Sequence, residues 1–375
     1  MQDLVLPILF AVGFLLFYVC VSGWLFSFNR LNNGQRILPL ESGPTVSWGF
    51  FDLFLTVALL VVFSGTFLFI AMKIAGIDEF TEELQNSSEG FLINLWINVL
   101  ASLSVFTIMA FSIYFRAGKG AIFGKGTETI FCDIRLGFIA FAMSIFPVIS
   151  IQFLVTRIWP YHHPVIDTFT ENVSLTLAIP TLLSAVICAP LFEEFTIRLL
   201  VQGWLCDWIS GRLDGAEVLW GKWKRPKEAF FDSSDDNQFS QVNESQDVST
   251  TQANFLDQDA EISNEDVHLS NSANPYFAPQ TPTEPSQFME AADPSPVLSP
   301  WWPLPIFISS ALFAAMHIGH GPAPIPLFFL ALVLGYLYQR TRRLTACLVV
   351  HFLVNAQAMC LLFLQIVFPE LFTPH

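Results

Sequence analysis

Long apolar runs separated by short polar segments dominate the chain. A helix needs about 20 mostly apolar residues to cross the hydrocarbon core of a bilayer. The alternating pattern of barrel strands is absent, and a helix satisfies its own backbone hydrogen bonds in lipid. The pattern therefore predicts an all-α polytopic membrane protein. We expect about eight transmembrane helices, at 4–28, 50–74, 91–115, 136–158, 174–207, 302–318, 324–339 and 345–368.

Basic residues indicate how these helices are oriented. Numbered from the N-terminus, the odd connections hold most of the lysines and arginines, and the positive-inside rule makes such connections cytoplasmic. We therefore expect a multi-pass protein of the plasma (inner) membrane with both termini outside. The first run has no basic region ahead of it and is long for a cleaved signal, so we expect it to remain as a span. The basic residues of the odd connections are Arg30, Arg36, Arg116, Lys119, Lys125, Arg135, Arg212, Lys222, Lys224, Arg225, Lys227, Arg340, Arg342 and Arg343.

The fifth run, 174–207, is too long for one simple span. A straight helix over it would measure about 50 Å, against a core of about 30 Å. It contains Pro180 and Pro190, which favour a kink. We expect it to be strongly tilted, kinked at a proline, or continued as a cytoplasmic helix through Trp204 and Trp208.

Composition agrees with a membrane protein that carries one polar insert. The chain is 53% hydrophobic and only 13% charged, whereas soluble domains carry about 25% charged residues. Residues 231–300 hold 13 acidic residues and no lysine or arginine, a composition that predicts disorder. The predicted parts are 1–173 (helices 1–4), 174–228 (helix 5 and a cytoplasmic extension), 229–300 (an acidic, disordered cytoplasmic insert) and 301–375 (helices 6–8).

Two classes of site find no support in composition. No basic patch with interleaved aromatic residues occurs, so we expect no nucleic-acid partner. The six cysteines include no C-x-x-C pair, which argues against a zinc ribbon or a disulfide framework.

Charged residues interrupt the fifth span in the stretch "EEFTIR". A charge at the centre of a bilayer costs about 2.5–3.5 kcal/mol on insertion scales. Glu194 and Arg198 are four residues apart, so they share a helical face and can pair. Glu193 points about 100° away from Glu194. The arginine therefore explains one glutamate, and Glu193 needs partners from another helix.

Two further spans carry polar residues of catalytic types. His317 lies in "FAAMH" of the sixth span, and His320 follows three residues later. His351 and Asn355 of "HFLVN" are four residues apart on one face of the eighth span. An imidazole and a carboxamide aimed at one point can stabilise an oxyanion, and a carboxylate beside an imidazole can deprotonate water.

These groups suit a hydrolase that uses an activated water. A zinc site from Glu193, His317 and His351 is an alternative, although the H-E-x-x-H motif is absent. A serine mechanism has weak support, since no G-x-S-x-G motif occurs. Interhelical hydrogen bonding without chemistry is the structural alternative. A transporter would need polar residues in several of the first four spans, and few are present.

The three motifs together resemble those of the type II CAAX prenyl endopeptidases and their wider relatives, the CAAX protease and bacteriocin-processing (CPBP, or Abi) membrane proteins. The family pattern is E-E-x-x-x-R, then F-x-x-x-H, then H-x-x-x-N, and here it corresponds to 193–198, 313–317 and 351–355. The resemblance covers about 174–207 and 302–360. Two departures are Leu199, where relatives often have glycine, and the insert between the first two motifs.

The resemblance implies a glutamate-type intramembrane endopeptidase without a metal or other cofactor. Glu193 would be the catalytic base, His317 would activate or hold the water, and His351 and Asn355 would form the oxyanion site. Glu194 and Arg198 would support the helix. The expected partners are the lipid bilayer and a peptide or protein substrate reached from the membrane or the cytoplasm. The alternative is a non-enzymatic membrane scaffold or chaperone of the same fold.

One geometrical conflict remains. Counting residues along straight helices puts His351 near the cytoplasmic end of its span and His317 towards the outer end of its own. For the two to meet, the sixth span must start deeper, be broken near "PWWPLP", or be strongly tilted.

Overall fold

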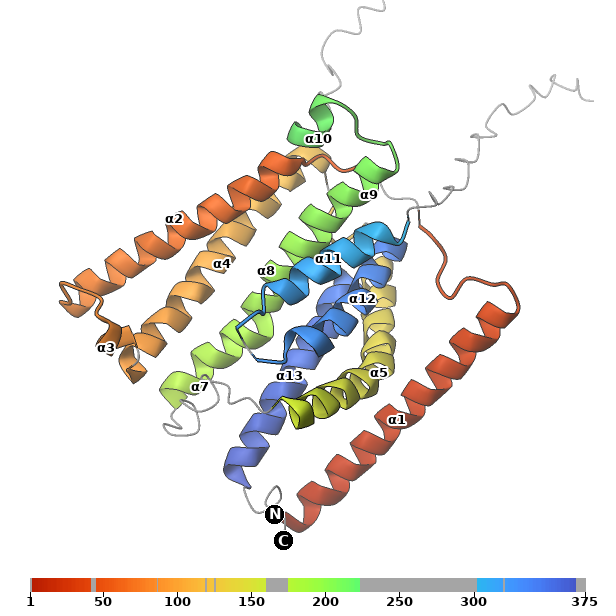
Figure 1. The fold of residues 1–375 in the computed structure, drawn as a ribbon, viewed down its shortest axis with the longest axis horizontal. Coiled ribbons are helices and arrows are strands. Elements are labelled where there is room, and N and C mark those ends of the chain that lie inside the picture. The colour runs from red at the N-terminus through yellow and green to blue at the C-terminus, as the bar shows by residue number, and fades with distance from the viewer. Residues whose placement is uncertain are drawn as a thin grey trace, which may run out of the picture. The chain divides into compact units, whose positions relative to one another are not determined.

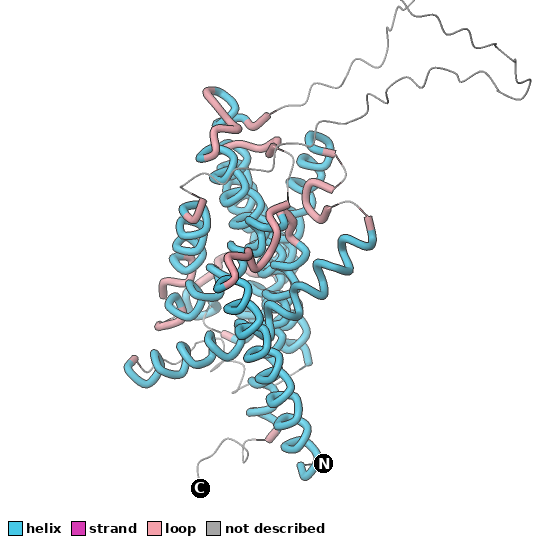
Figure 2. The backbone as a smooth tube through the Cα atoms, turned by 90° about the vertical axis from the view of Figure 1, so that its right-hand side faces the viewer, coloured by secondary structure: helices cyan, strands magenta, loops and turns pink. Residues whose placement is uncertain are grey.

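The computed structural model describes residues 2–41, 45–85, 87–118, 120–124, 126–159, 175–222, 302–319 and 321–368. Over these residues the chain is helical and no strand occurs (Figures 1 and 2), as the apolar pattern predicts. The predicted insert, 229–300, lies outside the described residues, and the predicted boundaries between the parts remain predictions.

Among the described residues, six helical segments are long and apolar enough to cross a membrane. They correspond to six of the predicted spans, and the chain is an integral membrane protein. Large apolar side chains such as Phe10 and Val61 are exposed on their outer faces, where lipid can solvate them. The six are α1 (Gln2–Asn32), α2 (Phe50–Ala75), α4 (Ser88–Ala117), α5 (Thr127–Ile158), the fifth segment (Thr176–Ile209) and α13 (Thr345–Val367).

The other two predicted spans form helices outside this group. The run 302–318 forms α11 (Leu304–Ala315), which has only 12 residues and rises about 18 Å, well short of a bilayer core of about 30 Å. The run 324–339 forms α12 (Pro324–Thr341), of 18 residues. Two short helices that the apolar pattern did not predict, α3 (Glu82–Gln85) and α10 (Ala216–Trp220), lie in connections.

The overlong fifth segment is divided into five pieces by two π-helical stretches. α7 (Leu175–Leu182) leads into η1 (Leu183–Cys188), and α8 (Ala189–Glu194) leads into η2 (Phe195–Gln202). The last piece is α9 (Gly203–Ile209), so the helix continues through the two tryptophans, and its cytoplasmic location remains a prediction.

Packing brings the segments that carry the three motifs together. α11 packs on α12 and on η2, while α13 packs on α5, α12, η1 and α8. In Figure 1 the green fifth segment and the blue α11, α12 and α13 lie side by side between the α2–α4 pair and α1. Fully buried apolar residues from these helices form the main core, among them Val105, Phe195, Leu199, Leu334 and Val350.

Ion pairs gather where several helices end. The buried Asp207 carboxylate at the end of α9 accepts hydrogen bonds from Arg342 and Arg212 and, at 2.7 Å, from the backbone N–H of Val46. Arg343 pairs with Asp133 of α5 and with Glu41. Hydrogen bonds to those two carboxylates raise the pKa of Arg343 above its usual range, so it remains charged.

This helix-end cluster joins segments at or beside the predicted odd connections. Arg116 at the end of α4 pairs likewise with Asp52 at the start of α2. The structure therefore brings residues at or beside the predicted first, third, fifth and seventh connections together, and the orientation of these connections remains a prediction.

Candidate active site

The adjacent glutamates lie on a short α-helical piece between two π-helical stretches. Glu193 and Glu194 end α8, with η1 before it and η2 after it. Such stretches are rare, and they occur frequently at functional sites. Each adds a residue to a turn and so changes which side chains share a face downstream.

Glu194 and Arg198 form the ion pair that their spacing predicts. Arg198 Nε lies 3.0 Å from Glu194 Oε2, and both side chains are fully buried. The Arg198 guanidinium also lies over the ring of Phe313 from α11, 5.4 Å from its centroid. The pair neutralises two charges that would otherwise be costly inside a membrane protein.

His351 from α13 binds the same glutamate from the other side. Its Nδ1 lies 3.0 Å from Glu194 Oε1. A carboxylate held by an arginine is an acceptor only, so Nδ1 carries the hydrogen and donates it. Glu194 therefore orients the imidazole as well as pairing with Arg198. Sequence spacing predicted the contact of Glu194 with Arg198 but not its contact with His351.

Glu193 faces the other nitrogen of the same ring. His351 Nε2 lies 3.7 Å from Glu193 Oε2, too far for a direct hydrogen bond. The Glu193 side chain retains 17% exposure, against 0% for Glu194. The two glutamates thus flank one imidazole, and the carboxylate beyond the ion pair is the more accessible.

His317 belongs to the same group through Phe313. It lies just beyond the end of α11, and its Nδ1 is 2.9 Å from the carbonyl oxygen of Phe313. The buried Phe313 ring contacts both histidines, with centroids 5.1 Å from His317 and 5.5 Å from His351. The short α11 therefore resolves the conflict of depth, because a helix that ends at Ala315 leaves His317 beside the Phe313 ring, which also contacts His351. His320 lies outside the described residues.

Asn355 is directed at the backbone of η1. Its Nδ2 donates to the carbonyl oxygen of Ala185 at 2.8 Å. The N–H of Ala189 bonds instead to Ser184, five residues back, and Pro190 has no N–H to offer. The Ala185 carbonyl thus lacks its usual helical donor, and Asn355 supplies one. The sequence signal for this contact is Pro190.

Trp48 plays the corresponding part at η2, and our sequence reasoning missed it. The N–H of Gly203 bonds to Arg198, five residues back. This leaves the carbonyl oxygen of Leu199 to the Trp48 indole, whose Nε1 lies 3.1 Å from it. Trp48 is almost fully buried. It lies between α1 and α2, so no local pattern near the fifth span indicates the contact.

Two further polar side chains, Gln202 and Ser309, connect to the buried arginine. Arg198 Nη1 donates to the hydroxyl of Ser309 at 3.3 Å, and that hydroxyl lies 3.1 Å from Gln202 Oε1. Sequence reasoning overlooked both contacts. The signal was present, since Gln202 follows Arg198 by four residues inside the same apolar run.

Potential metal ligands do not gather in the part of the chain that the structure describes. No group of three or more His, Cys, Asp or Glu side chains is arranged there to hold an ion. A zinc site from Glu193, His317 and His351 therefore has no ligand set among the described residues.

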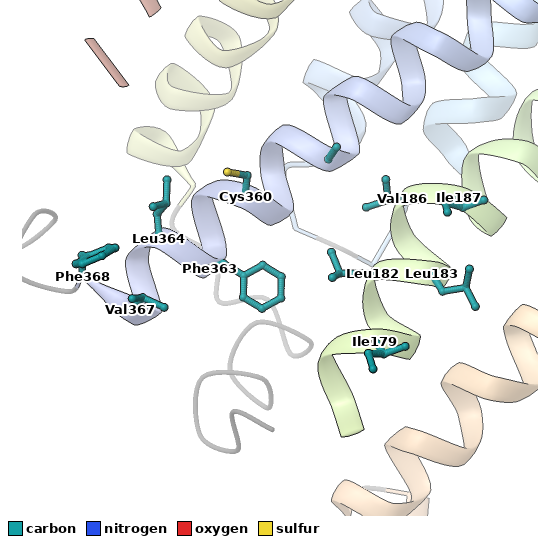
Figure 3. Close-up of a pocket in the computed structure, with 11 residues that line it drawn as sticks. Ile179, Leu182, Leu183, Val186, Ile187, Cys360, Phe363, Leu364, Val367 and Phe368 are labelled. Atoms are coloured by element: carbon teal, nitrogen blue, oxygen red, sulfur yellow. The ribbon is translucent and has the colours of Figure 1, made fainter. Parts of the chain in front are cut away.

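An open apolar groove lies beside the Asn355 contact. It has a volume of about 690 Å³ and lies between α7–η1 and the second half of α13 (Figure 3). Its lining includes Val186 and Ala356, the chain neighbours of Ala185 and Asn355. The groove therefore lies next to the hydrogen bond between Asn355 and Ala185, and its lining is apolar. The other lining residues are Ile179, Leu182, Leu183, Ile187, Cys360, Phe363, Leu364, Val367 and Phe368.

Comparison with known proteins agrees with this geometry. Residues 292–357 match the model of the family described as type II CAAX prenyl endopeptidase Rce1-like. No curated protein and no solved structure shows a significant match. The match includes His317, His351 and Asn355 but not the two glutamates, which the fold brings to the same place. The resemblance is thereby confirmed over this stretch: the part of the chain that carries these three residues is similar to the type II CAAX prenyl endopeptidase, Rce1-like family.

Proposed function

We propose that this CAAX-protease-like membrane protein is an intramembrane endopeptidase that hydrolyses a peptide bond with a water activated by Glu193. One observation carries the proposal. A single imidazole, His351, is fixed by Glu194 through one nitrogen and faces the more accessible Glu193 through the other. The ion pair within the fifth segment needs only Glu194 and Arg198. The extra carboxylate beside an oriented imidazole is the arrangement that general base catalysis requires.

In the proposed reaction Glu193 accepts a proton from a water molecule held beside His351 Nε2. The hydroxide oxygen bonds to the carbonyl carbon of the substrate, and the carbonyl oxygen becomes an oxyanion. When the carbon–nitrogen bond breaks, the proton passes from Glu193 to the leaving amine. Glu194 remains ionised throughout and keeps the imidazole in one tautomer, as the carboxylate does in a serine-protease triad.

His351, Asn355 and His317 have supporting roles in this scheme. A carboxamide has two N–H donors, and Asn355 uses one of them for Ala185. The second is available for the oxyanion. The neutral His351 uses its one N–H for Glu194, so its Nε2 accepts a hydrogen bond from the water instead. His317, held by the Phe313 carbonyl, would help to position the water.

The substrate is proposed to be a peptide or protein segment that arrives from the membrane. Support comes from the groove, which is lined by apolar side chains and reaches the neighbours of Asn355. An apolar segment can move along such a surface without leaving lipid, whereas a charged one cannot.

The proposed location is the plasma membrane, with the odd connections and the acidic insert in the cytoplasm. Support comes from the basic residues of those connections and from the ion pairs that gather them. Single cysteines placed in the insert of a variant without its six native cysteines test the orientation. We expect labelling by an impermeant maleimide only after the cells are opened. Labelling of intact cells contradicts it.

The activity is tested with purified protein in lipid vesicles and a pool of apolar peptides. We expect cleavage by the wild-type chain and none by Glu193→Ala or His317→Ala. Undiminished cleavage by both variants contradicts the mechanism. Two results together favour the scaffold alternative. The wild-type chain cuts no peptide of the pool, and no cellular protein changes length when Glu193 is replaced.

A further inference from the structure

The buried arginine of the site is itself held by a second set of polar side chains. We propose that Ser309 and Gln202 are positioning residues that fix Arg198 and, through it, the Glu194–His351 pair; this inference rests on the proposed function. Neither residue belongs to the three motifs that carry the family resemblance.

The orientation of Arg198 is set by two contacts. Its Nε binds Glu194 and its Nη1 binds the hydroxyl of Ser309. A guanidinium is a rigid planar fork, so two such contacts determine its plane. Nη2 has no hydrogen-bond partner and is buried, which makes the remaining two contacts the more important for holding the group.

Gln202 places an acceptor beside the Ser309 hydroxyl. Its Nε2 donates to the carbonyl oxygen of Gly335 on α12 at 2.7 Å, and this turns its Oε1 towards Ser309. The hydroxyl can then donate to Gln202 Oε1 or to the carbonyl oxygen of Ile306, each 3.1 Å away, while it accepts from Arg198. Gln202 and Ser309 are both fully buried, so no water competes for these bonds.

The close approach of α12 explains how the amide reaches its acceptor. A Cβ atom at Gly335 would lie 2.9 Å from a side-chain carbon of Ile306 and 3.3 Å from Gln202 Oε1. The hydrogen bonds therefore connect η2, α11 and α12 at one level. Two of these elements also carry residues of the site, because Arg198 belongs to η2 and Phe313 to α11.

The effect on chemistry follows from how Glu194 is shared. Arg198 holds Oε2 of Glu194, while Oε1 orients His351. If Arg198 loses the Ser309 contact, the carboxylate plane is less well fixed and the imidazole can turn. The loss falls on the chemical step rather than on substrate binding, because Ser309 lies behind Arg198 and away from the groove lining.

Ser310 provides a matched control. It is the next residue of α11, it is equally buried, and its hydroxyl has no hydrogen-bond partner. Ser309→Ala and Ser310→Ala remove the same atom from neighbouring buried positions, and only the first breaks a contact with Arg198.

The test measures kcat and KM for both variants on the peptide pool. We expect Ser309→Ala to lower kcat about tenfold with KM unchanged, and Ser310→Ala to leave both near wild type. Gln202→Leu should lower kcat similarly, and the double variant with Ser309→Ala should lose no more than either alone, because the two side chains act as a unit. Equal kcat values for the two serine variants overturn the proposal.

Deuterium uptake by backbone amides of 195–202 separates this proposal from the proposed function. We expect faster uptake in Ser309→Ala than in Ser310→Ala or wild type, whether or not any peptide is cut. If uptake follows this order and Glu193→Ala still cleaves, the proposed function fails and the positioning role stands. If uptake is equal in all three proteins, the positioning role fails whatever the activity.

Discussion

Two groups of buried charges in the described part of the chain differ in how the charges are balanced. At the helix ends every carboxylate of the cluster binds an arginine: Asp207 is shared by Arg342 and Arg212, and Arg343 binds both Asp133 and Glu41. Inside the bundle, Arg198 faces two carboxylates, Glu193 and Glu194, and satisfies only the second. The first cluster needs no function beyond holding helices together. The second contains one carboxylate, Glu193, beyond the one that pairs with its arginine. This extra carboxylate is our reason for proposing a catalytic role there.

The largest loss of stability is expected on removing the inner ion pair. Glu194→Ala leaves Arg198 fully buried without its carboxylate, and we expect the free energy of unfolding to fall by about 3–5 kcal/mol. Peptide cleavage should disappear as well, because His351 loses its anchor. Thermal unfolding in detergent measures the first effect. A variant as stable as wild type contradicts the assignment of Glu194 as a buried partner of both groups.

The helix-end cluster should affect stability without affecting chemistry. Asp207→Ala removes the acceptor of Arg342 and of the Val46 N–H, and we expect a loss of about 1–3 kcal/mol. The activity per folded molecule should be unchanged at temperatures where the variant is folded. A loss of kcat as large as that of Glu194→Ala would mean that the two clusters are not separate in function.

The Trp48 indole should have a smaller and more local effect. Trp48→Phe removes the donor to the Leu199 carbonyl at η2, with an expected loss of about 1 kcal/mol. Trp204→Phe is the control, since its indole donates to Val218 at 2.8 Å, away from η2. We expect faster deuterium uptake in 195–202 for the first variant only. The same uptake in both rules out a specific role for Trp48.

The smallest effect is expected where the cluster meets solvent. The Arg212 side chain is 39% exposed and shares Asp207 with the better buried Arg342. Exposed ion pairs contribute about 0–1 kcal/mol, so Arg212→Ala should change the unfolding midpoint little. A loss comparable with that of Asp207→Ala would show that the outer arginine, rather than Arg342, balances the carboxylate.

Periodicity predicted the parts of the fold that depend on local chemistry. Apolar runs identified six spans, because span length and hydropathy are properties of consecutive residues. The four-residue spacing of Glu194 and Arg198 predicted their pairing for the same reason. The run 302–318 was read as a full span because its apolar residues continue past Ala315, where α11 ends.

The contacts that complete the site could not be predicted in this way. Successive residues on a helix point about 100° apart, which suggested separate partners for Glu193 and Glu194. An imidazole has two nitrogens on opposite sides, so one ring can serve both. The contacts of Trp48 and Asn355 depend on carbonyls released by π-helical turns and on distant parts of the chain. Of these two contacts, only that of Asn355 had a local signal in the sequence, which was Pro190.

The most direct test of the central claim is the kcat of Glu193→Gln, measured together with its thermal unfolding. Glutamine keeps the size of the side chain but cannot act as a base. We predict that kcat falls by about 10²–10⁴-fold while the unfolding midpoint stays the same or rises, because Glu193 makes no ion pair with Arg198 that the fold requires. Wild-type kcat in this variant, or a large drop in the unfolding midpoint with the loss of activity, would contradict the account.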